Sequence, residues 1–450
     1  MAFISPMTSV KLQENLFRLA EIVHLRLFGH AMSDTMKGFL GNLSWSFSGG
    51  IFASIAMLFV NVLGGRYMGP EQYGLYGLVL AVSQIVMLPA VFGMDIAGLH
   101  FLSRSQKRED QSDNLTTTLI FVSFSSIVTV LSTFLVFFFF RQNFHFDAIF
   151  LVVTIVYSIA LIFRSITDIF FRGLHLFKEQ FFSRIAEVFL TVFSFVAIFF
   201  FLQEASYRSY VFVLFIGYIG FIIYGVGTFR TYFSKFRFSV LKHQLSYAWV
   251  VVLSSSLGVA FNVMDKIIIV QYLSIQELGI YMAYFTASTN LIAQATQMFV
   301  NVYFPAISRI SDNLFIKKLD RVFLLGAAPI FLLLCLIIYF IMFLFGSQYG
   351  QSLVYIVSFG LLATLQIVLT VYSSTIMALS KDLYKKYVII FNGINLVHLV
   401  GYFVLIFFER VSILALVYMF IANIGIAVFF QRRLIGKEKL GVYNDGVGIL

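Results

Sequence analysis

Charged residues are scarce in this sequence: 12% of its 450 residues are charged, whereas 60% are hydrophobic and 56 are phenylalanine. A soluble globular domain is nearer one quarter charged. Apolar runs of about 20 residues, the length that crosses a bilayer, recur along the whole chain. The runs are continuous rather than alternating, which favours membrane-spanning helices over a transmembrane β-barrel. The composition therefore predicts an all-α, polytopic membrane protein.

The motifs of several enzyme and metal-site classes are also missing. The one cysteine, Cys335, can form no intramolecular disulfide. The sequence contains no Gly-x-x-x-x-Gly-Lys-Ser/Thr loop for ATP hydrolysis, no Ser-His-Asp cluster in a loop, and no His/Cys spacing typical of a metal site. We therefore expect a protein that is not an enzyme, with no catalytic residues, no cofactor and no metal.

Twelve spans are predicted, near residues 44–65, 73–97, 115–140, 148–171, 182–202, 209–229, 246–271, 277–305, 322–345, 351–376, 387–408 and 411–431. They group into two six-helix bundles, 44–229 and 246–431, joined by a linker at 230–245 and followed by a tail at 432–450. Residues 1–43 stay outside the bilayer. Their leucines share one helical face, which fits either an amphipathic helix at the membrane surface or a loosely ordered tail.

The basic residues indicate the orientation of the chain. Of its 31 Lys and Arg residues, 25 fall in the termini and in every second loop, whereas the opposite loops hold Arg66, Arg141, Arg208 and Arg410. Because cytoplasmic loops are enriched in Lys and Arg, this asymmetry places both termini in the cytoplasm. It also explains most of the net charge of +10, so the charge is no sign of nucleic-acid binding.

An internal repeat with an offset of 205 residues supports the two-bundle architecture. It places Tyr67, Gly74 and Tyr76 on Tyr272, Gly279 and Tyr281. An even number of spans in each half gives two copies of the same orientation, related by pseudo-symmetry about the membrane normal. In transporters built this way the substrate path lies between the halves.

These turns also resemble a known family. The segment RYMGPEQYGLY, residues 66–76, is similar to the first-loop signature of polysaccharide flippases. Asp265 followed by Gly279-Ile280-Tyr281 is similar to their second-half counterpart. The resemblance implies a MATE-like fold of the multidrug/oligosaccharidyl-lipid/polysaccharide superfamily. It also implies an inner (plasma) membrane translocase that moves undecaprenyl-diphosphate-linked oligosaccharide, such as O-antigen units, from the cytoplasmic to the outer leaflet. The product would pass to polysaccharide polymerase and chain-length machinery.

Three charged residues mark a candidate site in the fourth span. Arg164, Asp168 and Arg172 are spaced four residues apart, so they share one helical face. Either arginine could bind a lipid diphosphate, because a guanidinium offers two parallel donors to phosphate. The alternative is a structural ion pair with Asp168. In the fifth span, Arg184 and Glu187 are predicted to form a local pair.

A second candidate site lies in the seventh span, where Asp265 and Lys266 interrupt an apolar run. As neighbours on a helix they point about 100° apart, so we do not expect them simply to pair with each other. Asp265 is a candidate proton or sodium site coupled to transport, and packing between helices is the alternative. Lys266 either contacts phosphate or extends toward the membrane surface.

Polar side chains form stripes on two further spans. In the eighth span the stripe consists of Thr286, Asn290, Gln294, Gln297 and Asn301, and in the eleventh of Asn392, Asn395 and His398. Because amides facing lipid are costly, the stripes should face inward. They could bind sugar hydroxyls or join helices. His398 taken alone is interpreted as a packed polar residue.

Two other functions remain open from the sequence. A drug or cation antiporter of the same superfamily shares the architecture, but its path needs net negative charge, whereas a diphosphate needs cations. The charged residues within the spans leave this balance ambiguous. A membrane glycan polymerase or ligase should carry a sizeable outer loop, and the outer loops here are only a few residues long.

Overall fold

A computed structural model describes residues 34–105, 107–140, 147–293, 296, 300, 313–379 and 381–444 of the chain. In these residues all regular structure is helical, which confirms the predicted all-α class. The helices are α2 (Asp34–Val91), α3 (Met94–Arg104), α4 (Arg108–Phe140), α5 (Ala148–Gly173), α6 (Phe177–Val196), η1 (Ala197–Phe201), α7 (Tyr207–Phe229), η2 (Arg230–Tyr232), α8 (Phe238–Tyr272), α9 (Ile275–Phe285), η3 (Thr286–Asn290), α11 (Asn313–Phe345), η4 (Ser347–Tyr349), α12 (Leu353–Leu379), α13 (Lys381–Phe407) and α14 (Ile413–Asn444).

Within the described residues, nine helices are long and apolar enough to cross a membrane, or ten if the bent α8 counts as one span. Two features reconcile this number with the twelve predicted spans. The first two spans form one continuous element, α2, which is divided by non-helical backbone at Gly69. The eighth span starts as α9 and η3 and runs on into residues that lie partly outside the described part of the chain.

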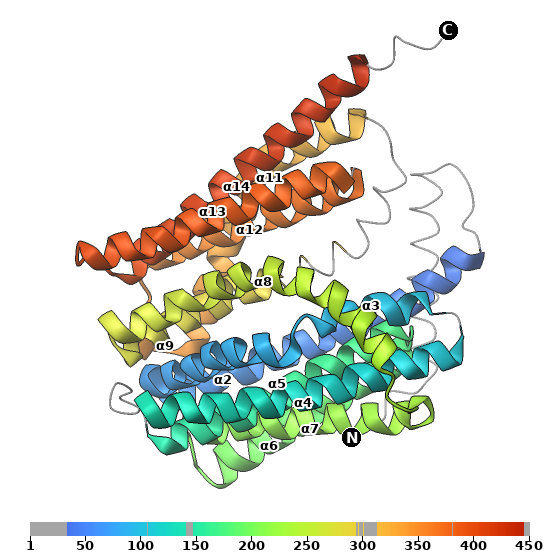
Figure 1. The fold of residues 1–450 in the computed structure, drawn as a ribbon. Helices are drawn as coiled ribbons and strands as arrows, with labels where there is room; N and C mark the ends of the chain where they lie inside the picture. The colour runs from blue at the N-terminus through green and yellow to red at the C-terminus, as the bar shows by residue number, and fades with distance from the viewer. Residues whose placement is uncertain are drawn as a thin grey trace, which may run out of the picture.

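The helices form two groups (Figure 1). We call α2 to α7 the N-terminal bundle, and α8, α9 and α11 to α14 the C-terminal bundle. Helices α8 and α9 lie between α2 and the last four helices. We name the two ends of the molecule by their loops. The basic end is where α5 ends and α8 begins, and the short-loop end is where α2 turns at Gly69 and α8 ends.

Some element boundaries differ from the predicted ones. Helix α2 starts at Asp34 rather than near residue 44, and residues 1–33, including the predicted surface helix, lie outside the described residues. Helix α8 starts at Phe238, so the second half of the predicted linker is helical. This extension is amphipathic: Leu241 and Gln244 are buried, and Gln244 Nε2 donates to the Asn114 side chain of α4 at 3.1 Å. Packing against the N-terminal bundle thus stabilises a helix in a segment whose polarity suggested a loop.

The repeated turns start their helices in different ways. In the first copy Gly69 has φ 78°, a left-handed value that favours glycine, and Pro70 begins the next helical segment, where its missing N–H costs nothing. In the second copy Ser274 accepts a hydrogen bond from the Glu277 backbone N–H at 3.0 Å and caps α9. Both turns therefore start a helix at the same place in the repeat.

The glycines of the repeat bring the two bundles into backbone contact. A Cβ on Gly74 would lie 2.0 Å from the carbonyl oxygen of Ile275, and one on Gly279 would lie 1.8 Å from that of Pro70. Either distance is far below a possible atomic contact. Only glycine at these two positions allows α2 and α9 to approach this closely.

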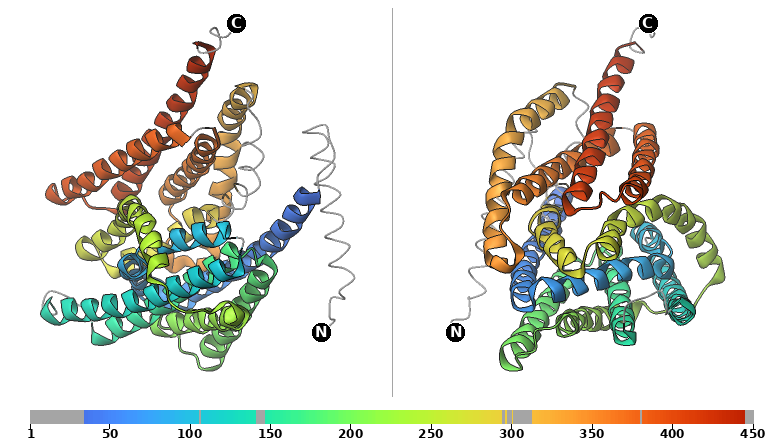
Figure 2. Two further views of the ribbon diagram at one scale, coloured as in Figure 1. Left: turned by 45° about the vertical axis from the view of Figure 1, so that its right-hand side comes forward. Right: turned by 90° about the vertical axis from the view of Figure 1, so that its left-hand side faces the viewer.

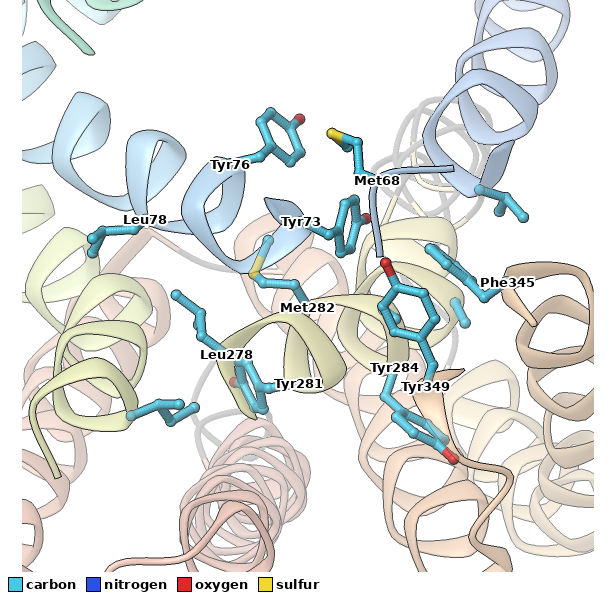
Figure 3. Packing of buried hydrophobic residues seen from close by; sticks show 14 of the residues in the cluster. Met68, Tyr73, Tyr76, Leu78, Leu278, Tyr281, Met282, Tyr284, Phe345 and Tyr349 are labelled. Carbon is cyan, nitrogen blue, oxygen red and sulfur yellow. The ribbon is translucent and has the colours of Figure 1, made fainter. Parts of the chain in front are cut away.

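The hydrophobic core is shared between the bundles at the short-loop end. One buried cluster includes residues of both bundles, among them Tyr73, Tyr76, Tyr281, Met282, Phe345 and Tyr349 (Figure 3). At the basic end, Ile376 and Leu383 belong to a separate cluster of the C-terminal bundle, whereas Ile166 and Phe171 belong to one that the N-terminal bundle forms with the start of α8. Figures 1 and 2 show α11 to α14 diverging from α2 to α7 toward the basic end.

The glycine contact yields a first prediction. We expect Gly279→Val to separate the bundles at the short-loop end, because overpacking costs about 1–3 kcal/mol. A cost of this size lowers the population of the closed state at least about fivefold. The measurement is the rate of disulfide formation between cysteines introduced at Arg66 and Gln348 in a Cys335→Ser background. Gly393→Val is the matched control, since a Cβ there meets nothing within 4 Å. Equal rates in the two variants would contradict the assigned contact.

Candidate functional site

Hydrogen bonds to backbone carbonyls join the two bundles at the short-loop end. The Tyr349 hydroxyl donates to the carbonyl of Gly65 at 2.6 Å, and Gln348 Nε2 donates to that of Arg66 at 2.6 Å. In return, Arg66 Nη1 donates to the carbonyl of Leu344 at 3.3 Å. The end of α2's first segment is thereby fastened to η4 and to the end of α11.

A buried tyrosine extends this junction inward. The Tyr73 hydroxyl donates to Asn61 Oδ1 at 2.7 Å and lies 3.2 Å from Thr286 Oγ1 of the C-terminal bundle. Because the single tyrosine proton goes to Asn61, the threonine is the donor in the second bond. The Tyr73 ring packs against Phe345 and Tyr349 (Figure 3). Opening the molecule at this end must break the Tyr73–Thr286 bond.

Arg164 is held inside the N-terminal bundle by Glu187 rather than by Asp168. Its Nε and Nη2 atoms donate to the two carboxylate oxygens of Glu187 at 3.2 and 3.1 Å, a bidentate pair between α5 and α6. The guanidinium also lies 4.9 Å from the centre of the Phe221 ring on α7. Three helices therefore hold Arg164, and its side chain is 25% exposed.

Asp168 gathers the other two arginines of this site. It forms an ion pair with Arg172, whose Nε atom lies 3.1 Å from Oδ2, and it accepts a hydrogen bond from Arg184 Nη2 at 3.1 Å. Gln180 Nε2 adds a bond of 2.8 Å. The predicted local pair of Arg184 with Glu187 is wrong, because each side chain reaches across to α5 instead. Three guanidinium groups and two carboxylates leave the described cluster with one net positive charge.

Asp265 and Lys266 pair with each other, contrary to our expectation. The Lys266 ammonium lies 3.1 Å from both carboxylate oxygens of Asp265 and donates to the carbonyl of Asn262 at 2.6 Å. The Tyr281 hydroxyl also donates to Asp265. The expectation failed because the angle between neighbouring Cβ directions does not restrict a flexible four-carbon stem, which can fold back along its own helix. Both side chains are buried.

The polar stripes are placed only in part. Thr286 is buried and bonded to Tyr73, whereas Asn290 is exposed at the end of the π-helical turn η3. Gln294, Gln297 and Asn301 lie outside the described residues. On α13, Asn395 is buried and accepts from Asn423 Nδ2 of α14 at 3.4 Å, so it joins two helices. His398, another residue of the predicted stripe on α13, is also buried.

The predicted residues thus separate into two clusters rather than one site. The arginines lie among α5, α6 and α7, and the Asp265–Lys266 pair lies among α8, α9 and α13. Sequence reasoning missed the junction formed by Asn61 and Tyr73, and it missed Gln180. Their signal was weak because each is an ordinary polar residue within or beside an apolar helix. Tyr281 was noticed as part of the repeat but was not assigned as the partner of Asp265.

Comparison with known sequences identifies the family of the chain. A profile described as "Polysaccharide biosynthesis protein" matches residues 39–311, more than half of the chain. The chain belongs to this polysaccharide biosynthesis family. A search of curated proteins returns no significant match.

Solved structures show which fold this family member has. It is similar to an inward-facing multidrug resistance MATE family transporter of the MOP superfamily, with a TM-score of 0.64 at 13% identity over 87% of this chain and 99% of that one. An outward-facing structure of such a transporter matches with a TM-score of 0.57 at 13% identity over 88% and 96%. A MATE in complex with MaL6 also scores 0.57, at 12% identity over 88% and 96%. The predicted MATE-like fold is confirmed, and the long apolar helices agree with a multi-span membrane protein.

The Arg164–Glu187 pair yields a second prediction. We expect Arg164→Met to destabilise this polysaccharide biosynthesis protein by about 3 kcal/mol, because it leaves a buried carboxylate unpaired. The double variant Arg164→Met/Glu187→Met should regain all but about 1 kcal/mol. The measurement is thermal unfolding in detergent. Arg208→Met is the control, because its pair with Asp147, at 3.8 Å, is exposed to solvent and its loss should leave the unfolding temperature nearly unchanged. A double variant as unstable as the single one would contradict this account.

Proposed function

We propose that this transporter moves polyprenyl-diphosphate-linked oligosaccharide from the cytoplasmic to the outer leaflet by alternating access. The family supplies the pathway, since its members are polysaccharide biosynthesis proteins. The fold supplies a two-bundle framework that can open to either side. The N-terminal bundle supplies a net positive cluster for the anionic lipid head. This positive cluster is the main support for the proposal, because surplus arginine would repel a cationic drug.

The direction of opening follows from the distribution of basic residues. If the basic end faces the cytoplasm, as Lys and Arg in the loops indicate, the short-loop end faces the outside. Both described ends of the chain, Asp34 and Asn444, then lie on the cytoplasmic side of the inner membrane. The bundles are bonded at the outer end and diverge at the cytoplasmic end, an arrangement that suits loading of a substrate made in the cytoplasm.

Arg172 is the arginine that we assign to the diphosphate. Its side chain is 46% exposed, and it shares the single carboxylate of Asp168 with Arg184. Arg164 lies about 14 Å from the end of α5, at 1.5 Å per residue, and is therefore deeper in the helix than Arg172. Fully engaged by Glu187, Arg164 raises the local positive potential rather than contacting the phosphate first. The sequence hypothesis left this role open to either arginine.

The remaining predicted residues keep proposed roles in the same cycle. Asn290 lies beyond the Tyr73–Thr286 bond on the eighth span, and with Gln294, Gln297 and Asn301 we assign it to sugar hydroxyls. Lys266 and Asp265 are buried together, so a phosphate role for Lys266 requires that the pair separate. Coupling of transport to an ion bound at Asp265 would also require that the Asp265–Lys266 pair separate. The polymerase and chain-length machinery that receives the product would lie at the short-loop end.

The decisive experiment uses a strain that lacks this gene. We expect lipid-diphosphate-linked repeat units to accumulate in the inner leaflet and surface polysaccharide to be lost, with both restored by the intact protein. Arg172→Gln should lower surface polysaccharide at least about tenfold at equal protein level, since one charged hydrogen bond contributes about 1.5–3 kcal/mol. Arg230→Gln, an exposed arginine of the same end, is the matched control.

The alternatives predict other outcomes. Normal surface polysaccharide together with altered sensitivity to cationic drugs would replace the proposal by the antiporter function. Repeat units that reach the outer leaflet but remain unpolymerised would indicate a polymerase. Full export by Arg172→Gln would remove that arginine from the substrate site.

A further inference from the structure

A cleft lies at the basic end, between the junction of α3 with α4 and the start of α8. Its volume is about 500 Å³. The candidate membrane span of α4 starts at Arg108, and that of α8 starts at Phe238. Both helices therefore reach the edge of the bilayer beside the cleft, which places it at the level of the lipid head groups.

The charged side chains that line the cleft carry one surplus positive charge. Three are basic and two are acidic: Arg104, Lys107 and Arg237 against Asp110 and Asp113. Asp113 is already paired, with Arg237 Nη1 at 2.9 Å, and it accepts from the Ser234 hydroxyl at 2.9 Å. In the part of the chain that the structure describes, no carboxylate lies within ion-pair distance of Arg104 or Lys107. Both of these basic side chains are exposed, so the cleft offers them to an anion.

The two sides of the cleft are fixed to each other by the segment that joins the bundles. The Ser234 backbone N–H donates to Thr116 Oγ1 of α4 at 2.9 Å, and Arg108 Nη2 donates to the carbonyl of Thr231 at 3.2 Å. Asp113, which is 5% exposed, adds the buried ion pair with Arg237 at the start of α8. The basic groups are therefore held in place before any ligand arrives, which lowers the cost of binding.

The cleft also has an apolar wall. Phe101 of α3 and Val240 of α8 line it, and the Phe101 ring packs edge-on against Tyr247 at 6.1 Å. Tyr247 and Trp249 follow on α8 and are 37% and 53% exposed. Tyrosine and tryptophan are enriched at the level of the lipid head groups. The cleft thus combines basic groups with an apolar surface that continues along α8 into the membrane.

We propose that this cleft binds the phosphate group of an anionic glycerophospholipid from the leaflet at the basic end. A phosphodiester carries one negative charge, which equals the surplus in the cleft, and its oxygens accept hydrogen bonds from Arg104 and Lys107. The transported lipid is the poorer fit, because a diphosphate carries more negative charge than the cleft neutralises. An acyl chain of the bound lipid would follow α8 toward Trp249, which lies about 14 Å beyond Val240 at 1.5 Å per residue.

The test is quenching of Trp249 fluorescence by brominated phospholipids in vesicles that contain the purified full chain. The background is Trp45→Phe, which leaves Trp249 as the one tryptophan. Dibrominated phosphatidylglycerol and dibrominated phosphatidylcholine are compared at the same low mole fraction in phosphatidylcholine vesicles. We expect the anionic lipid to bind at least about fivefold more tightly, the factor that one basic residue contributes at an anionic surface. Equal quenching by the two lipids would overturn the proposal.

A pair of double variants shows whether the preference belongs to the cleft. Arg104→Gln/Lys107→Gln should abolish it, and both side chains are exposed, so the substitutions leave the packing intact. Lys178→Gln/Arg230→Gln removes the same charge from exposed positions of the same end and should keep it. A preference that survives the first double variant, or one that is lost equally in both, would contradict the assignment.

Two further measurements separate the lipid head group from other sources of binding. Val240→Phe narrows the cleft without changing its charge and should also bring the two lipids toward equal binding; an unchanged preference would assign it to diffuse surface charge and refute the cleft. Inorganic phosphate in the buffer should act no more strongly than chloride of equal ionic strength. A preference lost in phosphate alone would make the ligand a soluble phosphate and refute the lipid. Because no glycan is present, either result is independent of the proposed transport.

Discussion

The arrangement of this protein depends on the contact of two glycine-bearing helix segments, α2 and α9, at the short-loop end. Between helices in a bilayer there is little hydrophobic driving force, so association depends on close packing and hydrogen bonds. Gly74 and Gly279 permit backbone contact, and Tyr349 and Gln348 add hydrogen bonds to carbonyl groups beside it. All of these contacts lie at one end. At the other end α11 to α14 diverge from the N-terminal bundle, whereas the start of α8 stays packed on it.

The cost of buried charge explains where the polar residues lie. The ionised groups inside α5, α6 and α8 form one cluster in each bundle, with carboxylates bonded to guanidinium, ammonium, amide or hydroxyl groups. A cluster satisfied within one bundle survives rocking of the bundles against each other, because no pair within it has to break. The Tyr73–Thr286 bond does cross the boundary, and it joins two neutral groups that are cheaper to separate.

Much of this architecture can be predicted from the sequence because it is periodic. Apolar run length predicts the helices, and the repeated Gly and Tyr positions predict two related bundles. In the structure Tyr67 and Tyr272 are both half exposed, and Tyr76 and Tyr281 are both buried. Spacing along one helix also allowed an ion pair of Asp168 with either arginine, and the structure shows the pair with Arg172. It could not predict Arg164–Glu187, because the choice of partner across helices depends on how α5 and α6 are rotated. The Asp265–Lys266 pair was missed for another reason. The prediction used the angle between neighbouring Cβ directions, and that angle does not restrict where a long, flexible lysine side chain ends.

The repeat keeps its framework but not its chemistry. The offset that places Tyr76 on Tyr281 places Val60 on Asp265 and Asn61 on Lys266. Accordingly the Tyr76 ring packs against another tyrosine, Tyr210, at 4.8 Å, whereas the Tyr281 hydroxyl bonds a carboxylate. The pseudo-symmetric turns and glycines give the two halves the same backbone framework. Transport in one direction needs a difference between the halves. In the proposed cycle the surplus arginine of the N-terminal half serves an anionic head group, whereas the C-terminal half carries the buried Asp265–Lys266 ion pair. The asymmetry of these side chains, rather than that of the backbone, can give the cycle its direction.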